Sequence, residues 1–376
     1  DMNSLKWVDD HLPRPSRAVD YPSDRVTPGD IRRALRGRKS RSSPGPDGMT
    51  YGILKGLPTL HGPIATLFTR MRSADNQLPP EGWAHSTSIL LYKKGSTSEP
   101  ANFRRIGLSN VLSKLYNSFL GRDAFSHGVA NGVIDPTCQK AFIPGVNGCG
   151  EHSFVVQEMV KNARDSGRAL HLTSLDLRDA YGSVSHDVMF WLLERAGVPA
   201  RHIYYLRGLY GTVTTSVTTA KWKTDAVHIR SGLITGDTFS TAGFLFVINP
   251  LICFLASEER HGYRLKVPKG PVPAAKLDVS EQKASRGYVD SHPTITTPFA
   301  DDFNLSTRNQ RTHQRILSAL APKVPTLMLE CRADKSVSFS IVKGSFKGRL
   351  TRRHSSFTRT ASLSDSIPHQ PGDPLH

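Results

Sequence analysis

The sequence predicts an α+β protein in which a β-sheet packs on helices, and three observations lead to this class. A chain of 376 residues with 38% hydrophobic content can bury the cores of two or three subdomains. The short apolar run at residues 170–175 is typical of a buried strand. Apolar residues with a helical period lie on both sides of that run, at residues 151–165 and 185–196.

The N-terminal third predicts a helix, a turn-rich segment and a basic hairpin. Thr27 is a candidate N-cap for a helix that begins at Pro28. The basic run Arg32 to Arg41 ends that helix, and it can be an RNA contact or a solvated helix face. An apolar helix is expected around residues 64–71. Ser88 to Tyr92 has the composition of a strand and leads into a lysine pair.

The middle of the chain predicts the order strand, acid, helix. Gly167 stops the helix at residues 151–165, and the following strand, residues 170–175, delivers Asp176 at its end. Ser185 caps the next helix. Residues 213–219 and 227–230 are rich in β-formers. The glycine-rich turn 232–236 then leads into a long apolar helix at residues 239–255, and we expect that helix and the helix at residues 185–196 to support the sheet.

The last third contains an acidic turn between two less ordered segments. Residues 266–297 are rich in Pro, Lys and Ser without clear periodicity, which indicates a long surface insertion. Phe299 to Phe303 follows and carries Asp301 and Asp302. Residues 346–376 form a basic tail rich in Ser, Thr and Pro, and we expect it to be disordered.

Charge and composition narrow the class of partner. Lys and Arg number 49 against 32 Asp and Glu, a formal net charge of +17, which favours a polyanion such as nucleic acid over a merely basic soluble surface. We expect no membrane-spanning segment and no signal or transit peptide. The four cysteines show no zinc spacing and are expected to be reduced thiols: Cys138, Cys149, Cys253 and Cys331.

Asp176 and Asp301 are the candidate metal ligands. Mg²⁺ prefers hard oxygen ligands, and two carboxylates on adjacent strands with a backbone carbonyl between them satisfy that preference. An Asp pair alone is a weak signal, because Asp9 and Asp10 form a second pair in a polar terminal segment. The pair at Asp301 and Asp302 differs because aromatic residues flank it and indicate a packed turn.

Three ordered motifs resemble the palm motifs of non-LTR retrotransposon reverse transcriptases of the site-specific type: Leu175-Asp-Leu-Arg-Asp-Ala-Tyr-Gly-Ser-Val-Ser185, Gly232-Leu-Ile-Thr-Gly-Asp-Thr-Phe-Ser240 and Phe299-Ala-Asp-Asp302. Ser43 to Gly48, Asn102 to Ile106 and Gln139 to Phe142 are similar to the finger motifs of that family. The resemblance covers about residues 40–345. It implies a right-hand polymerase fold with an antiparallel palm sheet and with a thumb that is absent or degenerate.

The resemblance implies an RNA-directed DNA polymerase that adds dNTPs to a DNA primer on an RNA template with two Mg²⁺ ions, for which Mn²⁺ is a substitute. Asp176 and Asp301 match the metal ligands of the family, with the Leu177 carbonyl between them. Asp302 matches the second acid of the pair. Tyr181 matches an aromatic gate against a ribose 2′ hydroxyl.

The remaining matches are contacts to nucleotide and nucleic acid. Arg104 and either Lys93 or Lys94 match triphosphate-binding residues of the fingers. Gly236 matches a position beside the incoming dNTP, while Gly232 and Thr235 match positions at template and primer. Lys335 matches a general acid for the departing pyrophosphate. A solvated lysine and a turn glycine remain the simpler interpretations.

Four positions depart from the family pattern. Thr235 stands where glutamine is usual, Arg105 where proline is usual, and Ala141 where glycine is usual. Pro298 precedes Phe299 and removes a donor from what we expect to be a central strand. These departures favour a second hypothesis, an inactive retroelement fragment that only binds nucleic acid. A third, an RNA-dependent RNA polymerase, is disfavoured by Tyr181.

The expected domains are an N-terminal extension at residues 1–24, fingers at 25–165, a palm at 166–345 that contains the insertion, and the tail. We expect residues 213–230 to extend the fingers across the palm sheet. The resemblance implies RNA template, DNA target and dNTPs as partners, no membrane, and an intracellular, nuclear location. Target site, host, oligomeric state and the presence of an endonuclease in a longer frame do not follow from these residues.

Overall fold

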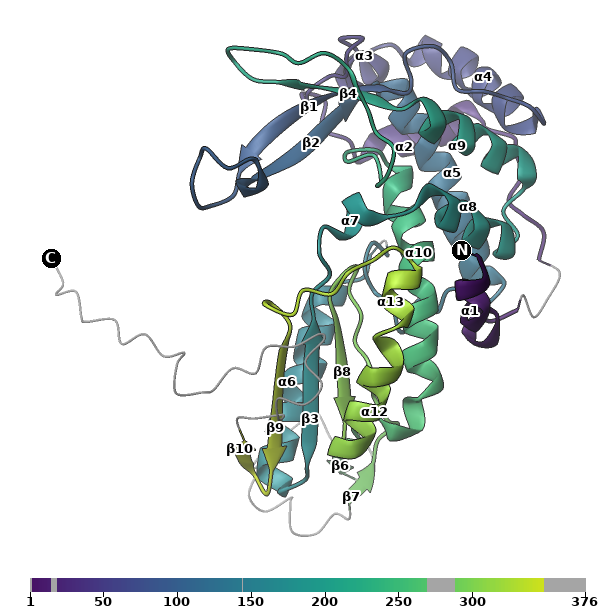
Figure 1. Ribbon diagram of the computed structural model, residues 1–376. Helices are drawn as coiled ribbons and strands as arrows, with labels where there is room; N and C mark the ends of the chain where they lie inside the picture. The colour runs from purple at the N-terminus through teal and green to yellow at the C-terminus, as the bar shows by residue number, and fades with distance from the viewer. Residues whose placement is uncertain (1, 15–18, 144, 269–287, 348–376) are drawn as a thin grey trace, which may run out of the picture. The chain divides into compact units, whose positions relative to one another are not determined.

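The computed structural model describes residues 2–14, 19–143, 145–268 and 288–347, and the chain forms two compact units (Figure 1). Unit 1 consists of residues 1–12, 136–178 and 250–376, and unit 2 consists of residues 13–135 and 179–249. The expected boundaries of fingers and palm stay predictions.

The sheet of unit 1 is antiparallel, as the sequence predicted. Its strand order is β10-β9-β3-β8, and every neighbouring pair runs antiparallel. The strands are β3 (Leu170–Leu175), β8 (Phe303–Thr307), β9 (Val337–Val342) and β10 (Ser345–Lys347). β3 has the bounds that its apolar run predicted. β10 includes residues 346 and 347, so these two residues do not belong to the expected disordered tail. The other residues of that tail, 348–376, lie outside the described ones.

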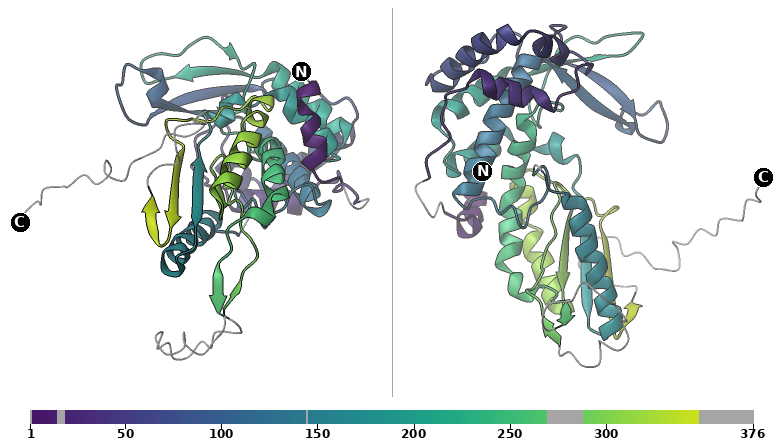
Figure 2. Two further views of the ribbon diagram at one scale, coloured as in Figure 1. Left: turned by 60° about the horizontal axis from the view of Figure 1, so that its bottom comes forward. Right: turned by 180° about the vertical axis from the view of Figure 1, so that it is seen from behind.

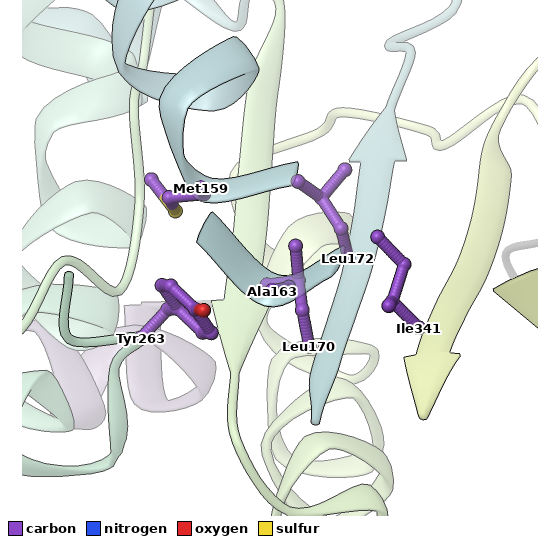
Figure 3. Close-up of a cluster of buried hydrophobic side chains, with 6 residues drawn as sticks. All are labelled: Met159, Ala163, Leu170, Leu172, Tyr263 and Ile341. Carbon is purple, nitrogen blue, oxygen red and sulfur yellow. The ribbon is translucent and has the colours of Figure 1, made fainter. Parts of the chain in front are cut away.

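Helices α6 (Gly148–Ser166) and α12 (Gln310–Leu320) cover opposite faces of this sheet. Successive side chains of a strand point to opposite faces. Leu170 and Leu172 of β3 pack with Met159 and Ala163 of α6 in a buried cluster, which Figure 3 shows together with Tyr263 and Ile341. The view from behind in Figure 2 shows α6 along the sheet. The sequence assigned this support to residues 185–196 instead, which is wrong because that helix belongs to unit 2.

The α12 face of β3 is polar and fully hydrogen-bonded around one imidazole. His313, 0% exposed, lies between Thr173 and Thr307, whose hydroxyls are 2.7 Å from Nε2 and 3.0 Å from Nδ1. Thr173 also bonds Ser338 at 2.7 Å. Burial, followed by the nearby His171, lowers the pKa of His313 to about 3, so the ring is neutral.

Several shorter elements complete unit 1. At its N-terminus, Leu5 and Val8 are buried, and Trp7 Nε1 donates to Thr326 Oγ1 at 3.0 Å. The segment expected as an unstructured insertion contains strand pairing, because β6 and β7 form a two-stranded sheet and residues 295–297 are buried. Its residues 269–287 lie outside the described ones. The elements are η1 (Met2–Leu5), α1 (Lys6–His11), η4 (Glu259–His261), β6 (Lys266–Pro268), β7 (Tyr288–Asp290) and α13 (Lys323–Thr326).

Unit 2 has its own sheet, with strand order β2-β1-β4-β5. Its strands are β1 (His85–Tyr92), β2 (Phe103–Ser109), β4 (Thr214–Thr218) and β5 (Val227–His228). β1 and β2 form the expected hairpin, and β1 pairs with β4 in parallel. Residues 213–230 thus extend the sheet of the expected hairpin, with β4 on β1 and β5 on β4, and their course across the palm sheet stays a prediction.

The helices of unit 2 surround α5, a long helix buried on most sides. Val111, Leu115, Tyr116, Phe119 and Leu120 of α5 are each at most 2% exposed. The expected start of α2 is confirmed, because Thr27 and Asp30 form a reciprocal capping box. The elements are α2 (Pro28–Arg36), α3 (Tyr51–Gly56), η2 (Pro58–Leu60), α4 (His61–Ser73), η3 (Pro100–Asn102), α5 (Val111–Ala130), α7 (Ala180–Ser183), α8 (His186–Arg195) and α9 (Ala200–Thr212).

Helix α10 (Phe239–Ser257) begins in unit 2 and ends in unit 1. It is the one helix among the described residues that is long and apolar enough to cross a membrane, with a mean hydropathy of 1.9. The sequence analysis did not single out this helix as long and apolar enough to cross a membrane. However, 83% of that window is buried within the protein, as in the core helix of a soluble protein.

Candidate active site

The three predicted carboxylates meet at one end of the sheet of unit 1. Asp176 directly follows β3, and Asp301 and Asp302 directly precede β8. β3 and β8 pair with Leu175 opposite Phe303. Asp302 lies close enough to Asp301 and Asp176 for both negative charges to act on its carboxyl. The antiparallel ladder thus brings together residues that are more than a hundred positions apart in the sequence.

The electrostatics of Asp302 reflect this crowding. Burial raises the pKa of its carboxyl, and the negative charges of Asp301 and Asp176 raise it further. Three carboxylates meet here with Arg332 as a cationic neighbour, 3.9 Å from Asp176 Oδ2, and a divalent cation is one group that supplies further positive charge. The arrangement is therefore electrostatically prepared for a cation.

Asp176 provides a direct test of whether a metal fits. Its Oδ2 atom is buried and has no hydrogen-bond partner among the described residues, and Arg332 Nε lies 3.9 Å away. Within that part of the chain, no three His, Cys, Asp or Glu side chains form a group that could hold a metal by themselves. Mg²⁺ commonly takes one or two protein carboxylates and completes its shell with phosphate and water. The donors present fit that mode of binding.

The Leu177 carbonyl points toward the side of β8. Arg332 N donates to Asp176 O at 2.7 Å, and Arg178 N donates to Glu330 O at 2.7 Å, so these two residues turn their polar groups toward residues 330–332. In an antiparallel ladder the polar groups of successive residues face alternate sides. Leu177, which lies between them, therefore turns its carbonyl away, as a ligand shared with Asp301 requires.

Residues 332–336 hold Asp176 from both sides of its peptide unit. Besides the bond from Arg332 N, the Asp176 N–H donates to Ser336 Oγ at 3.1 Å, and Ser336 is 1% exposed. The pairing with β9 is interrupted between these two contacts by a turn at residues 333–335. Lys335 lies in that turn and is exposed. The sequence reading missed Ser336, since a serine that follows a lysine gives no recognisable signal.

Asp301 lies in a two-residue hairpin turn. Phe299 and Asp302 exchange both backbone hydrogen bonds, at 2.7 and 3.1 Å, which leaves Ala300 and Asp301 as the central residues. Ala300 has a φ of +54°, and Asp301 is not among the residues with positive φ. Positive φ at the first central residue alone matches a type II′ hairpin turn.

The structure corrects the interpretation of Pro298. The strand that contains it is not central, because it lies beyond β8, the last strand of the sheet, and joins it through isolated bridges. Phe299 turns its N–H toward Asp302, so the nitrogen of the preceding residue faces away from the ladder. A proline there removes no ladder bond, and the position is one that tolerates proline.

The predicted triphosphate contacts lie on the hairpin of unit 2. Arg104 is an exposed residue of β2 and pairs with Leu91 of β1. Lys93 and Lys94 are exposed where β1 turns toward β2, and Lys93 N donates to Asn102 O at 2.8 Å. The hairpin thus gathers three cationic side chains at its outer end.

The predicted loop 232–236 is tightly packed against backbone in unit 2. A Cβ atom on Gly236 would lie 2.1 Å from Gly107 O, and one on Gly107 would lie 2.2 Å from Thr235 O. Gly232 and Gly236 have φ values of +86° and +88°, which favour glycine. The close approach that requires glycine is therefore made by β2 itself. The sequence did not single out Gly107, because an isolated glycine in a strand does not indicate which segment packs against it.

Two further side chains surround this loop. The Tyr181 ring stacks on Phe244 of α10 with 4.8 Å between centroids and 17° between planes. Asp237, which the sequence reading passed over, accepts a hydrogen bond from Asn117 Nδ2 at 2.8 Å and one from Phe239 N at 2.9 Å. Burial raises the pKa of Asp237 to about 6. These contacts fix the loop at the start of α10.

Two-metal sites are found in polymerases, nucleases and phosphatases, and clustered carboxylates are the ligands that hard divalent ions prefer. Residues 91–358 match the family described as reverse transcriptase (RNA-dependent DNA polymerase). The match covers more than half of the chain, and the chain therefore belongs to this family. It is a reverse transcriptase domain of the non-LTR retrotransposon kind, as its motifs indicated.

The curated relatives agree with this assignment. The chain is 24% identical over 313 residues to the Pol polyprotein from the type-1 retrotransposable element R2 of Popillia japonica, a match that covers 83% of the chain and 39% of the relative. It is 25% identical over 244 residues to the Pol polyprotein from the type-2 retrotransposable element R2DM of Drosophila melanogaster, covering 64% of the chain and 22% of the relative. The chain thus spans less than half the length of either relative.

Among solved structures, the chain is similar to a telomerase from Candida tropicalis in complex with a fragment of telomeric RNA. The TM-score is 0.47 at 10% identity, and the match covers 85% of the chain and 50% of the telomerase.

Proposed function

We propose that this domain is the polymerase of a non-LTR element and adds dNTPs to the 3′ end of a DNA primer on an RNA template. The observation that carries the proposal is the meeting of Asp176 with the Asp301 turn at adjoining ends of β3 and β8. The family assignment gives the class of reaction, and this arrangement gives the residues. In finer terms, the proposed fold of the described residues is the fingers and palm of a right hand.

Asp176, Asp301 and the Leu177 carbonyl are the proposed ligands of two Mg²⁺ ions, with Asp302 as a supporting acid. When bound, the ions activate the primer hydroxyl and hold the triphosphate, and Mn²⁺ can replace them. Asp176 contributes its unpartnered Oδ2. Ser336 and Arg332 keep the Asp176 peptide in place, so the carboxylate needs little reorganisation before reaction. Lys335 is the proposed proton donor to the departing pyrophosphate.

Unit 2 supplies the proposed contacts to the incoming nucleotide. Arg104, with Lys93 or Lys94, neutralises the triphosphate, and the planar guanidinium suits paired phosphate oxygens. Tyr181 is the proposed gate against a ribose 2′ hydroxyl, and its stacking on Phe244 limits the ring to one orientation. Gly236 contributes contacts to the nucleotide, and Gly232 and Thr235 contribute contacts to template and primer.

The partners proposed with this function are an RNA template, a DNA target and dNTPs, and we propose a nuclear location. The net charge of +17 supports binding to nucleic acid. A second candidate, a fragment that binds nucleic acid without polymerising, is favoured by Thr235 at a position where glutamine is usual. Pro298 no longer favours it, because its nitrogen faces away from the ladder.

Primer extension on a poly(A) template with dTTP tests the proposal. We expect incorporation that Asp176→Ala abolishes, because that variant removes the unpartnered metal-facing oxygen. The chain offers a matched control in its other acidic pair, and Asp10→Ala should leave incorporation unchanged. Template binding measured in the same samples separates the two candidates. Binding without any incorporation dependent on Asp176 would leave only the nucleic-acid-binding fragment.

A further inference from the structure

The turn that carries Asp301 contains a backbone conformation that needs outside support. Ala300, which has a Cβ atom, occupies the left-handed region at φ +54° and is 5% exposed. Such conformations persist at functional sites where neighbouring groups hold them. The N–H of Ala300 is not used by the Phe299 and Asp302 pair, so its partner lies elsewhere.

That partner is Gln139, from the segment before α6 in the same unit. Gln139 Oε1 accepts a hydrogen bond from Ala300 N at 3.3 Å and another from Ala141 N at 2.9 Å. Gln139 is 2% exposed and Ala141 is 0% exposed, so water does not compete for either donor. The amide oxygen of Gln139 therefore links Ala300, the turn residue with positive φ, to the buried segment 139–141.

A second contact from the same region reaches the residue before the turn. His152 of α6, which is 8% exposed, lies with Nε2 3.1 Å from Cys138 O and also hydrogen-bonds the backbone of Pro298. The outward-facing polar groups of residues 298 and 300 are thus both held by the neighbourhood of residues 138–139. On its other side, the turn is held by the β3 and β8 ladder.

We propose that Gln139 is a positioning residue that fixes the Asp301 carboxylate through the N–H of Ala300. The inference deepens the proposed polymerase function and rests on it. Ligand atoms of a working site must be held within roughly 0.5 Å, and a misplacement of about 1 Å can cost about 100-fold in rate. Removing the acceptor leaves a buried N–H unpaired and frees Ala300 to leave its left-handed conformation, which moves the adjacent Asp301.

Gln139→Met tests the role, because it preserves length and burial but removes the acceptor. Gln139→Glu keeps an oxygen at the same reach and should rescue. Gln139→Asn shortens the side chain by one methylene and provides a milder loss of the same contact if the methionine variant does not fold. Asn162→Leu is the control, because Asn162 accepts from Tyr263 Oη at 3.1 Å in the same unit, ten residues after His152 on α6.

Hydrogen exchange of the Ala300 amide in the metal-free protein is the first measurement. We expect exchange at least about tenfold faster in Gln139→Met, near the wild-type rate in Gln139→Glu, and unchanged in Asn162→Leu, because a lost hydrogen bond opens that amide. Unchanged exchange at Ala300 in both the methionine and asparagine variants would overturn the proposal. This readout does not depend on polymerase activity.

Mn²⁺ binding, followed by electron paramagnetic resonance, is the second measurement. We expect the dissociation constant to rise at least about threefold in Gln139→Met, with rescue by Gln139→Glu and no change in Asn162→Leu. Equal affinity in the wild type and Gln139→Met would overturn the positioning role. Failure of the proposed function gives a different result. In that case Asp301→Asn would bind Mn²⁺ as tightly as the wild type, while Gln139→Met would still accelerate hydrogen exchange at the Ala300 amide.

Discussion

Unit 1 and unit 2 hold their candidate site residues by different physical means. In unit 1, the acidic residues lie at strand ends, and hydrogen bonds from the ladder, from Ser336 and from Gln139 fix their peptides. In unit 2, the loop 232–236 is fixed by backbone contact with Gly107, which leaves no space for a Cβ atom. Side chains whose peptides are held by hydrogen bonds tolerate isosteric exchange, whereas a loop in steric contact does not. Substitutions should therefore affect chemistry in unit 1 and stability in unit 2.

The largest effect is expected for Asp301→Asn. The amide keeps the shape of the side chain but removes the charge that a metal needs, and metal-dependent charge stabilisation is worth several kcal/mol. Incorporation in primer extension should fall at least about 1,000-fold, while the midpoint of urea unfolding stays unchanged. The same exchange at Asp10, in the other acidic pair, should alter neither quantity. A large loss of stability in Asp301→Asn would contradict the contrast between the units.

Gly236→Ala should produce the opposite pattern. Its Cβ would lie 2.1 Å from Gly107 O, and the φ of +88° adds strain, so we expect a loss of about 2–3 kcal/mol in the free energy of unfolding. Gly56→Ala is the matched control, because nothing lies within 4 Å of that site, and its effect should stay within about 0.5 kcal/mol. Urea denaturation followed by circular dichroism compares the two. Equal stabilities would show that the loop can move away from β2.

The pH dependence of stability should differ in sign between His313 of unit 1 and Asp237 of unit 2. The pKa of His313 is lowered to about 3, so the unfolded chain binds the proton more readily. Its stabilising contribution is complete above the ordinary histidine pKa and is lost as the pH falls from about 6.5 toward 3, by up to about 1.4 kcal/mol per pH unit. The pKa of Asp237 is raised to about 6, so its burial costs stability above that pH and not below its ordinary pKa.

Unfolding free energies measured from pH 4 to 8 check this prediction. His313→Gln should flatten the acid limb of the profile, and Asp237→Asn should flatten the limb near pH 6. Parallel profiles for wild type and both variants would show that neither buried group titrates with folding.

The smallest effect is expected for Ser336→Ala. It removes the acceptor of the Asp176 N–H, and a lost hydrogen bond of this kind costs about 1 kcal/mol. We expect incorporation to fall by about tenfold, because the carboxylate of Asp176 loses one of its two peptide anchors. The exposed Ser345 is the control, and Ser345→Ala should be neutral. A loss of stability without any loss of incorporation would assign Ser336 to the fold alone.

The sequence by itself determined the local elements and the family, and it predicted the residues of the site. The apolar run 170–175 predicted β3 to the residue, and Thr27 and Pro28 predicted the start of α2, because burial pattern and capping are local properties. The ordered motifs predicted the family that residues 91–358 confirm. They also singled out Asp176, Asp301 and Asp302, since acidic residues between apolar strand ends carry a chemical signal without any knowledge of the fold.

Only the tertiary structure decided which elements become neighbours. β4 pairs with β1 in the sheet of unit 2, and α6 and α12 are the helices that contact β3. Pro298 removes no hydrogen bond from the ladder, because its nitrogen faces away from β8. Gly107, Gln139 and Ser336 contact residues that are far away in the sequence. Strand pairing and buried hydrogen bonds join distant residues, and a local pattern does not specify the distant member of such a pair.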